Sequence, residues 1–228
     1  MHIHFIQHVP FEYPGSILDW AAEKRHTTAF TKVFDGDAFP VPGQFDMLVI
    51  LGGPMGVYEE NIYPWMTLEK QCIKAAIEAD KKVLGVCLGS QFIANVLGEE
   101  VYAHTQKEIG WWPVQKIGEH PLTAGLPTEF ITFHWHGDTF RLPKGTVQLF
   151  RSAVCEQQGF IYNNHAAGVQ FHIEVKQDLL DGMTEHESNE LTGEGYVQTA
   201  ETIKQHIAAE IPRQNNYMKA FLDNFEKL

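Results

Sequence analysis

The chain has 228 residues, 44% of them hydrophobic, and is therefore long enough for one large domain with a substantial core. Its 17 basic and 29 acidic residues give a formal charge of −12, which disfavours binding to nucleic acid phosphates or to anionic membranes. Its three cysteines are too scattered for a disulfide framework, and no segment has the length and apolarity of a membrane span. We therefore expect a cytoplasmic protein that acts on small molecules or binds protein partners.

Strand-like and helix-like segments alternate in the first half of the chain. Apolar runs predict strands at residues 2–9, 45–54 and 81–89, and 3.6-residue periodicity predicts helices at 16–33, 67–80 and 90–98. Ser16 and Thr67 are the predicted N-caps of the first two helices, and Gly98 is the predicted end of the third. Strands separated by helices of this size are typical of a largely parallel sheet with helices on both faces.

The second half of the chain has a different pattern, which predicts strands that pair in another way than those of the first half. Short β-like pieces, broken by Gly, Pro and Asn, lie at residues 111–117, 130–140, 147–153, 158–164 and 166–175. They predict an antiparallel continuation of the same sheet. The acidic residues 182–195 predict an exposed connection, and residues 196–228 predict helices around a break at Pro212. We therefore predict one domain over 1–228, a three-layer open α/β sheet, with a C-terminal helical extension from about residue 177 to 228.

One cysteine lies between two glycines where an apolar run meets a helical segment, in the sequence GVCLG at residues 85–89. A Gly-x-nucleophile-x-Gly sequence at such a junction forms a tight turn that exposes its central side chain at the end of the sheet. The N-terminus of the following helix, near Leu88, favours a thiolate at Cys87. We interpret Cys87 as a nucleophile held in such an elbow rather than as a packing residue.

A thiol nucleophile needs a base, and the sequence GVQFHIEV supplies one candidate. His172 and Glu174 are two residues apart in a strand-like run, so their side chains point to the same side. A carboxylate in reach of an imidazole fixes its tautomer and stabilises its protonated form. Cys87, His172 and Glu174 are therefore the predicted catalytic residues.

The segments GVCLGSQ and QFHIE together resemble the class I glutamine amidotransferase family. Its catalytic domains carry a G-x-C-x-G elbow, a Gln four residues after the cysteine and a late F-H-x-E strand. VILGGPMGVY also resembles the family's oxyanion loop, and FHWHGDTF resembles the S-H-G-D segment of GMP synthetases. The resemblance covers about residues 1 to 180, and it implies hydrolysis of the glutamine side-chain amide through a γ-glutamyl thioester, with release of ammonia.

The resemblance also assigns supporting residues. It implies that the backbone N–H groups of Gly53 and Leu88 form the oxyanion hole. The residues that it implies for substrate binding, mostly through main-chain groups, are Met55, Gln91, Trp135, Gly137 and Asp138. It implies no cofactor and no metal. The chain departs from the family at Ile173, where many members have Pro, and in the tail after Lys176.

The sequence is compatible with three functions. The family usually couples its glutaminase to an ammonia-consuming synthase, and the chain carries no phosphate-binding loop of its own. A stand-alone glutamine hydrolase, which either hydrolyses alone or supplies ammonia to a separate synthase, is the first hypothesis. A γ-glutamyl peptidase acting on glutathione-like compounds is the second, and a non-catalytic metabolite- or partner-binding protein on the same fold is the third. The sequence does not choose an oligomeric state.

Twelve histidines are numerous for a chain of this size, which raises the hypothesis of a metal site. The pairs His2/His4 and His134/His136 each point two imidazoles to one face of an extended segment. Neither pair has a Cys, Asp or Glu cluster at ligand spacing nearby, so packing or hydrogen bonding is the favoured interpretation. Cys72 and Cys155 are interpreted as packing residues.

Overall fold

A computed structural model describes all residues from 1 to 228. The strands are β1 (His2–Gln7), β2 (Thr27–Lys32), β3 (Met47–Ile50), β4 (Lys82–Val86), β5 (Val101–Lys116), β6 (Glu129–Phe140), β7 (Thr146–Arg151), β8 (Gly159–Tyr162) and β9 (Ala166–Val169). The α-helices are α1 (Ser16–Glu23), α2 (Trp65–Glu78), α3 (Leu88–Val96), α4 (Gln177–His186) and α5 (Ala200–Lys227).

All nine strands form one mixed sheet in the order β2-β1-β3-β4-β9-β8-β7-β5-β6. The pairs from β2 through β9 are parallel, and the pairs from β9 through β6 are antiparallel. Strands β3 and β4 are buried on both faces and are nearly continuous apolar runs, as central parallel strands are. The predicted α/β fold, with a parallel half and an antiparallel extension, is confirmed.

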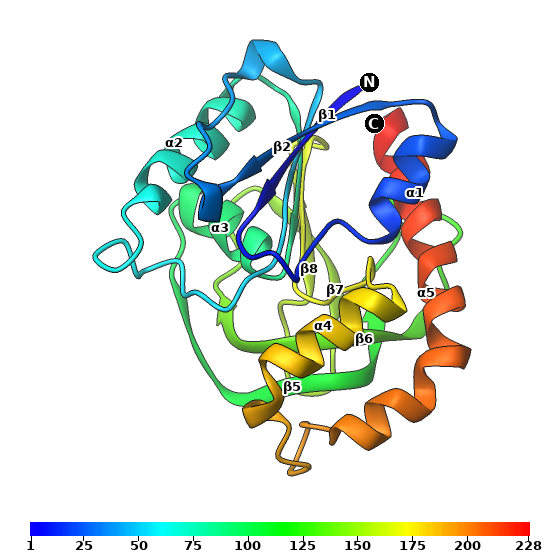
Figure 1. Cartoon of the computed structure of the whole chain (residues 1–228). Helices are drawn as coiled ribbons and strands as arrows, with labels where there is room; N and C mark the ends of the chain where they lie inside the picture. Colours follow the sequence, from blue (N-terminus) through cyan, green and yellow to red (C-terminus); the bar gives the residue numbers. More distant parts are fainter.

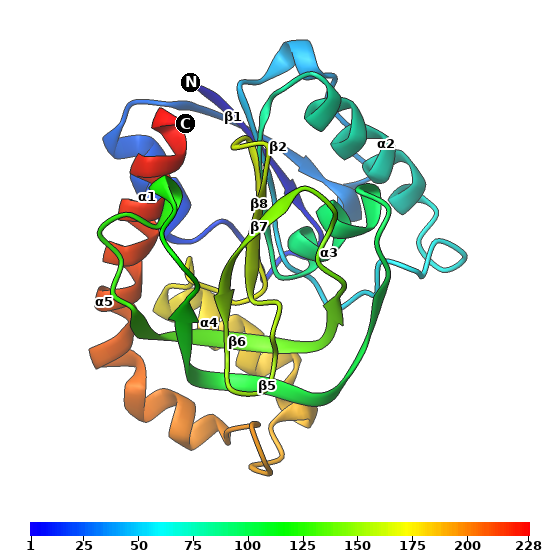
Figure 2. The ribbon, with the colours of Figure 1, turned by 180° about the vertical axis from the view of Figure 1, so that it is seen from behind.

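Helices cover both faces of the sheet, as Figure 1 and, from behind, Figure 2 show. On one face α1 and α5 pack on the sheet through a buried cluster that includes Ile17, Trp20 and Phe221. On the other face α2 and α3 bury a second cluster. A smaller cluster lies between α4, α5 and the strands β5 and β6. The predicted C-terminal extension therefore contributes to the core rather than standing apart from it.

The helix predicted over residues 16–33 was wrong in its second half. Helix α1 ends at Glu23, the backbone turns at Arg25 with a φ of 60°, and residues 27–32 form the parallel edge strand β2. Three threonines in that segment favour an extended backbone, because β-branched side chains lose rotamer freedom in a helix. The N-caps also differ, since Gly15 precedes α1 and Pro64 precedes α2 in place of Ser16 and Thr67.

The region after the catalytic segment is more regular than expected. Residues 182–195, predicted as an exposed connection, contain the end of α4, where Met183 and Thr184 are buried. The break predicted at Pro212 is absent, because α5 continues as one helix through that residue. Figure 1 shows α5 changing direction along its length, which is how a helix accommodates an internal proline.

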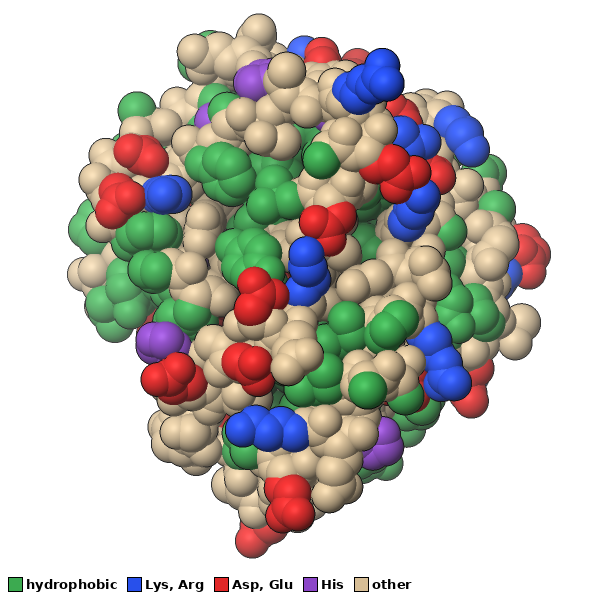
Figure 3. Space-filling view, turned by 45° about the vertical axis from the view of Figure 1, so that its right-hand side comes forward, with side chains coloured by type: hydrophobic (Ala, Val, Ile, Leu, Met, Phe, Trp, Pro, Cys, Tyr) green, Lys and Arg blue, Asp and Glu red, His purple; other side chains and the backbone are tan.

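The distribution of charged side chains on the surface agrees with the net negative charge of the chain. On the face shown in Figure 3, acidic and basic side chains are interspersed, and no separate basic patch forms. None of the helices combines the length and the apolar character that crossing a bilayer would need.

The glycines around Cys87 allow a close approach that a larger residue would prevent. A Cβ at Gly89 would overlap the backbone carbonyl of Ile50, whereas a Cβ at Gly98, where φ is +94°, would meet open space. We expect Gly89→Ala to lower the unfolding free energy by about 3 kcal/mol or more, and Gly98→Ala by about 1–2 kcal/mol from backbone strain alone. Urea denaturation of both variants tests this, and equal losses would contradict it.

Candidate active site

The predicted catalytic residues lie in loops that follow the carboxyl ends of the parallel strands. Cys87 follows β4, Gly53 follows the neighbouring strand β3, and His172 follows β9 on the other side of β4. Carboxyl ends of parallel strands meet at one edge of the sheet, and ligands of open α/β sheets bind there. The sheet order therefore brings together residues that are distant in the sequence.

Cys87 has the backbone conformation of a nucleophile elbow. Its φ is 50° and its ψ −109°, it precedes the first residue of α3, and its N–H donates to the carbonyl of Val169 at 2.8 Å. A positive φ is strained for a residue with a side chain. The turn persists because β4 and α3 pack tightly, and a Cβ at Gly85 would overlap the backbone of Gly89. The strain presents the Cys87 side chain to a cavity at the sheet edge.

His172 and Glu174 form the expected pair, although not on a strand. Strand β9 ends at Val169, and the two residues lie in an irregular segment that a single bridge from His172 to Phe133 of β6 anchors. His172 Nδ1 lies 2.9 Å from Glu174 Oε1, and both side chains are buried. The strand predicted through 175 was thus too long.

Electrostatics at this pair favour a protonated imidazole. Burial alone would lower the pKa of His172, but the Glu174 carboxylate and the Cys87 side chain outweigh burial and raise this pKa well above its usual value. The arrangement can supply a thiolate together with a proton donor beside it.

A second buried His–Glu pair holds the glycine loop after β3. His8 Nδ1 donates to the Gly52 carbonyl at 2.9 Å, and His8 Nε2 lies 2.9 Å from Glu69 Oε1. Burial opposes a charge on His8, yet the Glu69 carboxylate outweighs it and raises the pKa of His8. A Cβ at Gly53 would lie 3.2 Å from Leu88 Cδ2, so this loop lies directly beside the start of α3. His8 and Glu69 were not recognised in the sequence.

The predicted binding residues line the same cavity, whose volume is about 400 Å³. Met55, Gln91, Trp135, Gly137 and Asp138 all contribute to its wall, together with Cys87 and His172. The Trp135 carbonyl lies 3.5 Å from Cys87 Sγ. Asp138 accepts a hydrogen bond from the Tyr58 hydroxyl at 2.9 Å.

Two further polar residues near Cys87 were missed. Gln170 Nε2 lies 3.6 Å from Cys87 Sγ, and Gln170 Oε1 accepts from Gln91 Nε2 at 3.1 Å. Glu12, in the loop after β1, lies within the cavity wall, and burial raises its pKa to about 7, opposed by His172. A carboxylate soon after the first strand, in HVPFEYPG, was the signal that could have identified Glu12.

The cavity wall is strongly acidic. Its five carboxylates are those of Glu12, Glu59, Asp138, Glu187 and Glu190. Lys107 is its one ammonium group, and Lys107 Nζ is paired with Glu190 Oε1 at 2.8 Å. The wall therefore favours a ligand with a positively charged group and disfavours additional negative charge.

The three cysteines differ in surroundings, which predicts selective alkylation. Burial, with Glu69 nearby, raises the pKa of Cys72 to about 12, and burial also raises the pKa of Cys155 to about 11, so both remain thiols at neutral pH. We expect iodoacetamide at pH 7 to modify Cys87 at least about tenfold faster than either. Peptide mass spectrometry measures this selectivity, and His172→Gln should remove it. Equal rates at the three cysteines would contradict a thiolate at Cys87.

Comparison with known proteins gives the family. The family model "Glutamine amidotransferase class-I" matches residues 23–186. The "glutamine amidotransferase-like protein YfeJ" of Salmonella typhimurium is 33% identical over 98% of this chain and 96% of its own length. One subunit of the glutamine-hydrolysing GMP synthase of Sulfolobus acidocaldarius is 35% identical over 58% of this chain and 69% of its own length.

A solved structure agrees over the full length. The crystal structure of a glutamine amidotransferase from Thermotoga maritima has a TM-score of 0.91 and 32% identity to this chain, covering 100% of this chain and 99% of that one. Similarity of this extent includes the C-terminal helices that the sequence resemblance did not reach. The chain belongs to the class I glutamine amidotransferase family.

Proposed function

We propose that the protein hydrolyses the side-chain amide of glutamine through a γ-glutamyl thioester on Cys87. The observation that carries this proposal is the strained elbow that holds Cys87 in the same cavity as His172, whose Nδ1 lies 2.9 Å from Glu174 Oε1. A thiolate next to an imidazolium is an activated nucleophile with a proton donor in reach. Glu174 orients His172 and stabilises its charge.

In the first half of the reaction, the Cys87 thiolate attacks the amide carbon, and the carbonyl oxygen becomes negatively charged. Leu88 is the first residue of α3, so no partner within the helix bonds its N–H. This N–H and that of Gly53, in the adjacent loop, are the proposed oxyanion donors. His172 transfers its proton to the leaving nitrogen, the C–N bond breaks and ammonia departs. The chain then carries a γ-glutamyl thioester.

In the second half of the reaction, a water molecule enters the place that ammonia has left. His172, now neutral, takes a proton from the water as it attacks the thioester carbon. The C–S bond breaks, glutamate leaves, and the Cys87 thiolate and the His172 imidazolium are restored. No cofactor is needed for this cycle, because water replaces the proton that His172 gives to ammonia, and Cys87 regains its electron pair when the C–S bond breaks.

The charge of the cavity wall supports glutamine over glutathione-like substrates. Glutamine carries an α-ammonium group, and the ammonia that it releases has no negative charge. Glutathione adds the carboxylate of its leaving dipeptide to the α-carboxylate that both substrates carry, in a cavity whose wall has five acidic side chains and one paired lysine. The γ-glutamyl peptidase hypothesis therefore ranks second. A non-catalytic role ranks third, because it gives no reason for a strained cysteine beside a buried His–Glu pair.

A separate ammonia-consuming partner is part of the proposal. Relatives of this chain include one that is a separate subunit of a glutamine-hydrolysing GMP synthase. The residues Met55, Gln91, Trp135, Gly137 and Asp138 are the proposed glutamine-binding set, since all five line the cavity around Cys87.

Ammonia release tests the function directly. The wild-type chain should release ammonia from glutamine faster than it releases amine from γ-glutamyl dipeptides. Cys87→Ala should lower turnover by about four orders of magnitude or more, and Glu174→Gln by about 100-fold or more while glutamine still binds. Coupled detection of glutamate with glutamate dehydrogenase measures these rates. Unchanged turnover in Cys87→Ala would exclude the thioester route.

Covalent labelling tests for a glutamine site in the isolated chain even where ammonia release requires a partner protein. A glutamine analogue with a diazoketone in place of the amide should alkylate Cys87 in the isolated chain, and mass spectrometry locates the adduct. Cys87→Ala is the matched control. Absence of both labelling and ammonia release would contradict a glutamine site.

The charge of Glu12 should affect the pH dependence of kcat/KM. Above about pH 7, Glu12 is ionised beside His172 and stabilises the imidazolium. In Glu12→Gln this negative charge is missing, so the pKa of His172 should fall, and the alkaline limb of kcat/KM should move to lower pH. Glu185→Gln, an exposed change on α4 outside the cavity wall, should leave the profile unchanged. Identical profiles for wild type and Glu12→Gln would contradict this coupling.

A further inference from the structure

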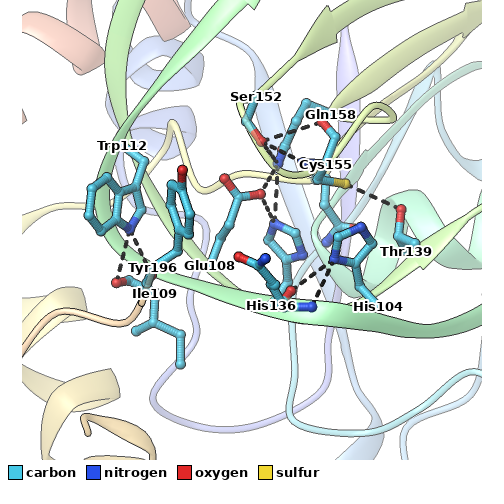
Figure 4. Close-up of polar contacts among 12 residues, drawn as sticks. His104, Glu108, Ile109, Trp112, His136, Thr139, Ser152, Cys155, Gln158 and Tyr196 are labelled. Atoms are coloured by element: carbon cyan, nitrogen blue, oxygen red, sulfur yellow. Dashed lines mark hydrogen bonds and ion pairs between the residues drawn. The ribbon is translucent and has the colours of Figure 1, made fainter. Parts of the chain in front are cut away.

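Three buried side chains of β5 and β6 converge beside the cavity. Glu108 of β5 is directly opposite His136 of β6 in the antiparallel register, and His134 lies two residues earlier on the same face of β6. The exposed fractions of Glu108, His134 and His136 are 1%, 0% and 5%. Figure 4 shows the Glu108 carboxylate and the His136 ring facing each other, with Gln158 beside them.

The hydrogen bonds of this group satisfy Glu108 and His136. His136 Nδ1 lies 3.1 Å from the Asp138 carbonyl oxygen, which only accepts, so Nδ1 carries the hydrogen. In the neutral ring, His136 Nε2 then has a lone pair, and it lies 3.3 Å from Glu108 Oε2. Gln158 Nε2 lies 2.7 Å from Glu108 Oε2 and 3.3 Å from His136 Nε2, so its two amide hydrogens can bond to both acceptors.

His134 is the unsatisfied member of the group. Its ring is fully buried, and neither of its nitrogens has a hydrogen-bond partner. The Gln158 amide serves Glu108 and His136 and leaves His134 with an unpaired polar group in the interior. A metal ion bound to all three residues accounts for the whole group.

The spacing fits a small divalent cation. The candidate ligand atoms of the three residues all lie within 4.8 Å of one another. Tetrahedral zinc with bonds of about 2.0–2.1 Å has neighbouring ligand atoms about 3.3–3.4 Å apart. The contact between His136 Nε2 and Glu108 Oε2 already has this spacing.

We propose that Glu108, His134 and His136 form a binding site for Zn²⁺. Two imidazoles with one carboxylate suit zinc, whereas Ca²⁺ and Mg²⁺ prefer oxygen ligands alone. The bond from His136 Nδ1 to the Asp138 carbonyl is the kind of outer contact that fixes the tautomer of a ligating histidine. Gln158 is buried beside the group, and its Oε1 has no partner, so a half-turn of this amide, in which the ion replaces its two hydrogen bonds, presents a fourth ligand.

Binding of the ion would have a structural consequence. His136 lines the cavity that also holds Cys87. Strand β6 also carries Trp135, Gly137 and Asp138 in the cavity wall, and zinc would tie this segment to β5. The proposal does not depend on the substrate of the enzyme.

Zinc binding to the full chain tests the site. The catalytic pair of Cys87 and His172 can itself bind zinc, so all proteins carry Cys87→Ser. Competition with a chromophoric chelator should show one tightly bound equivalent of Zn²⁺. Since even outer partners of a metal site change affinity about 10–100-fold, His134→Asn and Glu108→Gln should each weaken binding by about 100-fold or more. His206→Asn, an exposed change on α5, is the matched control and should have no effect.

Two results would overturn the proposal. One is zinc affinity that His134→Asn and Glu108→Gln leave unchanged, and the other is the absence of a tight equivalent in the starting protein. If a variant fails to fold by circular dichroism, X-ray absorption of the zinc-loaded Cys87→Ser chain decides. Scattering from two imidazoles and oxygen supports the site. Sulfur scattering, from Cys155 or Cys72, or coordination by water alone, contradicts it.

Discussion

The positive φ of Cys87 is the constraint on which the site depends. The turn from β4 into α3 is too tight for side chains at Gly85 and Gly89, and the Gly89 position is closed by the backbone of β3. The fold supplies this conformation at the cost of strain, which the buried clusters on the two faces of the sheet offset. Packing of the core therefore sustains the strained backbone of Cys87, and this backbone directs the sulfur into the cavity.

Two buried His–Glu pairs lie near this turn. We propose that His172 with Glu174 exchanges protons with a substrate, whereas His8 with Glu69 holds the carbonyl of Gly52 and so the loop that carries Gly53. Both imidazoles have raised pKa values because a carboxylate outweighs the effect of burial. The proposed roles of the two pairs differ, although their local physics is the same. Only position relative to Cys87 distinguishes them.

The sequence predicted the elbow, the family and the alternation of strands and helices, because each leaves a local pattern of glycines or apolar residues. It misplaced β2, since a helical period continued into residues whose threonines favour a strand. It also assigned His172 to a strand that ends at Val169. Gln170 and Glu69 could not be found from spacing, because strand order and helix packing decide what they touch. Glu108 is the sharpest case, since only the pairing of β5 with β6 brings it to the histidine pair.

The order of strands in the sheet has a consequence for folding. Strand β4, which precedes Cys87, pairs with β9, and every strand from β5 to β8 lies between them in the chain. Contacts at such separation form late, because the entropy of closing a long loop opposes them. Until β9 is in place, His172 is not held beside Cys87. The reactivity that we propose for Cys87 therefore requires the complete fold, so a partly folded chain would not carry an activated thiolate.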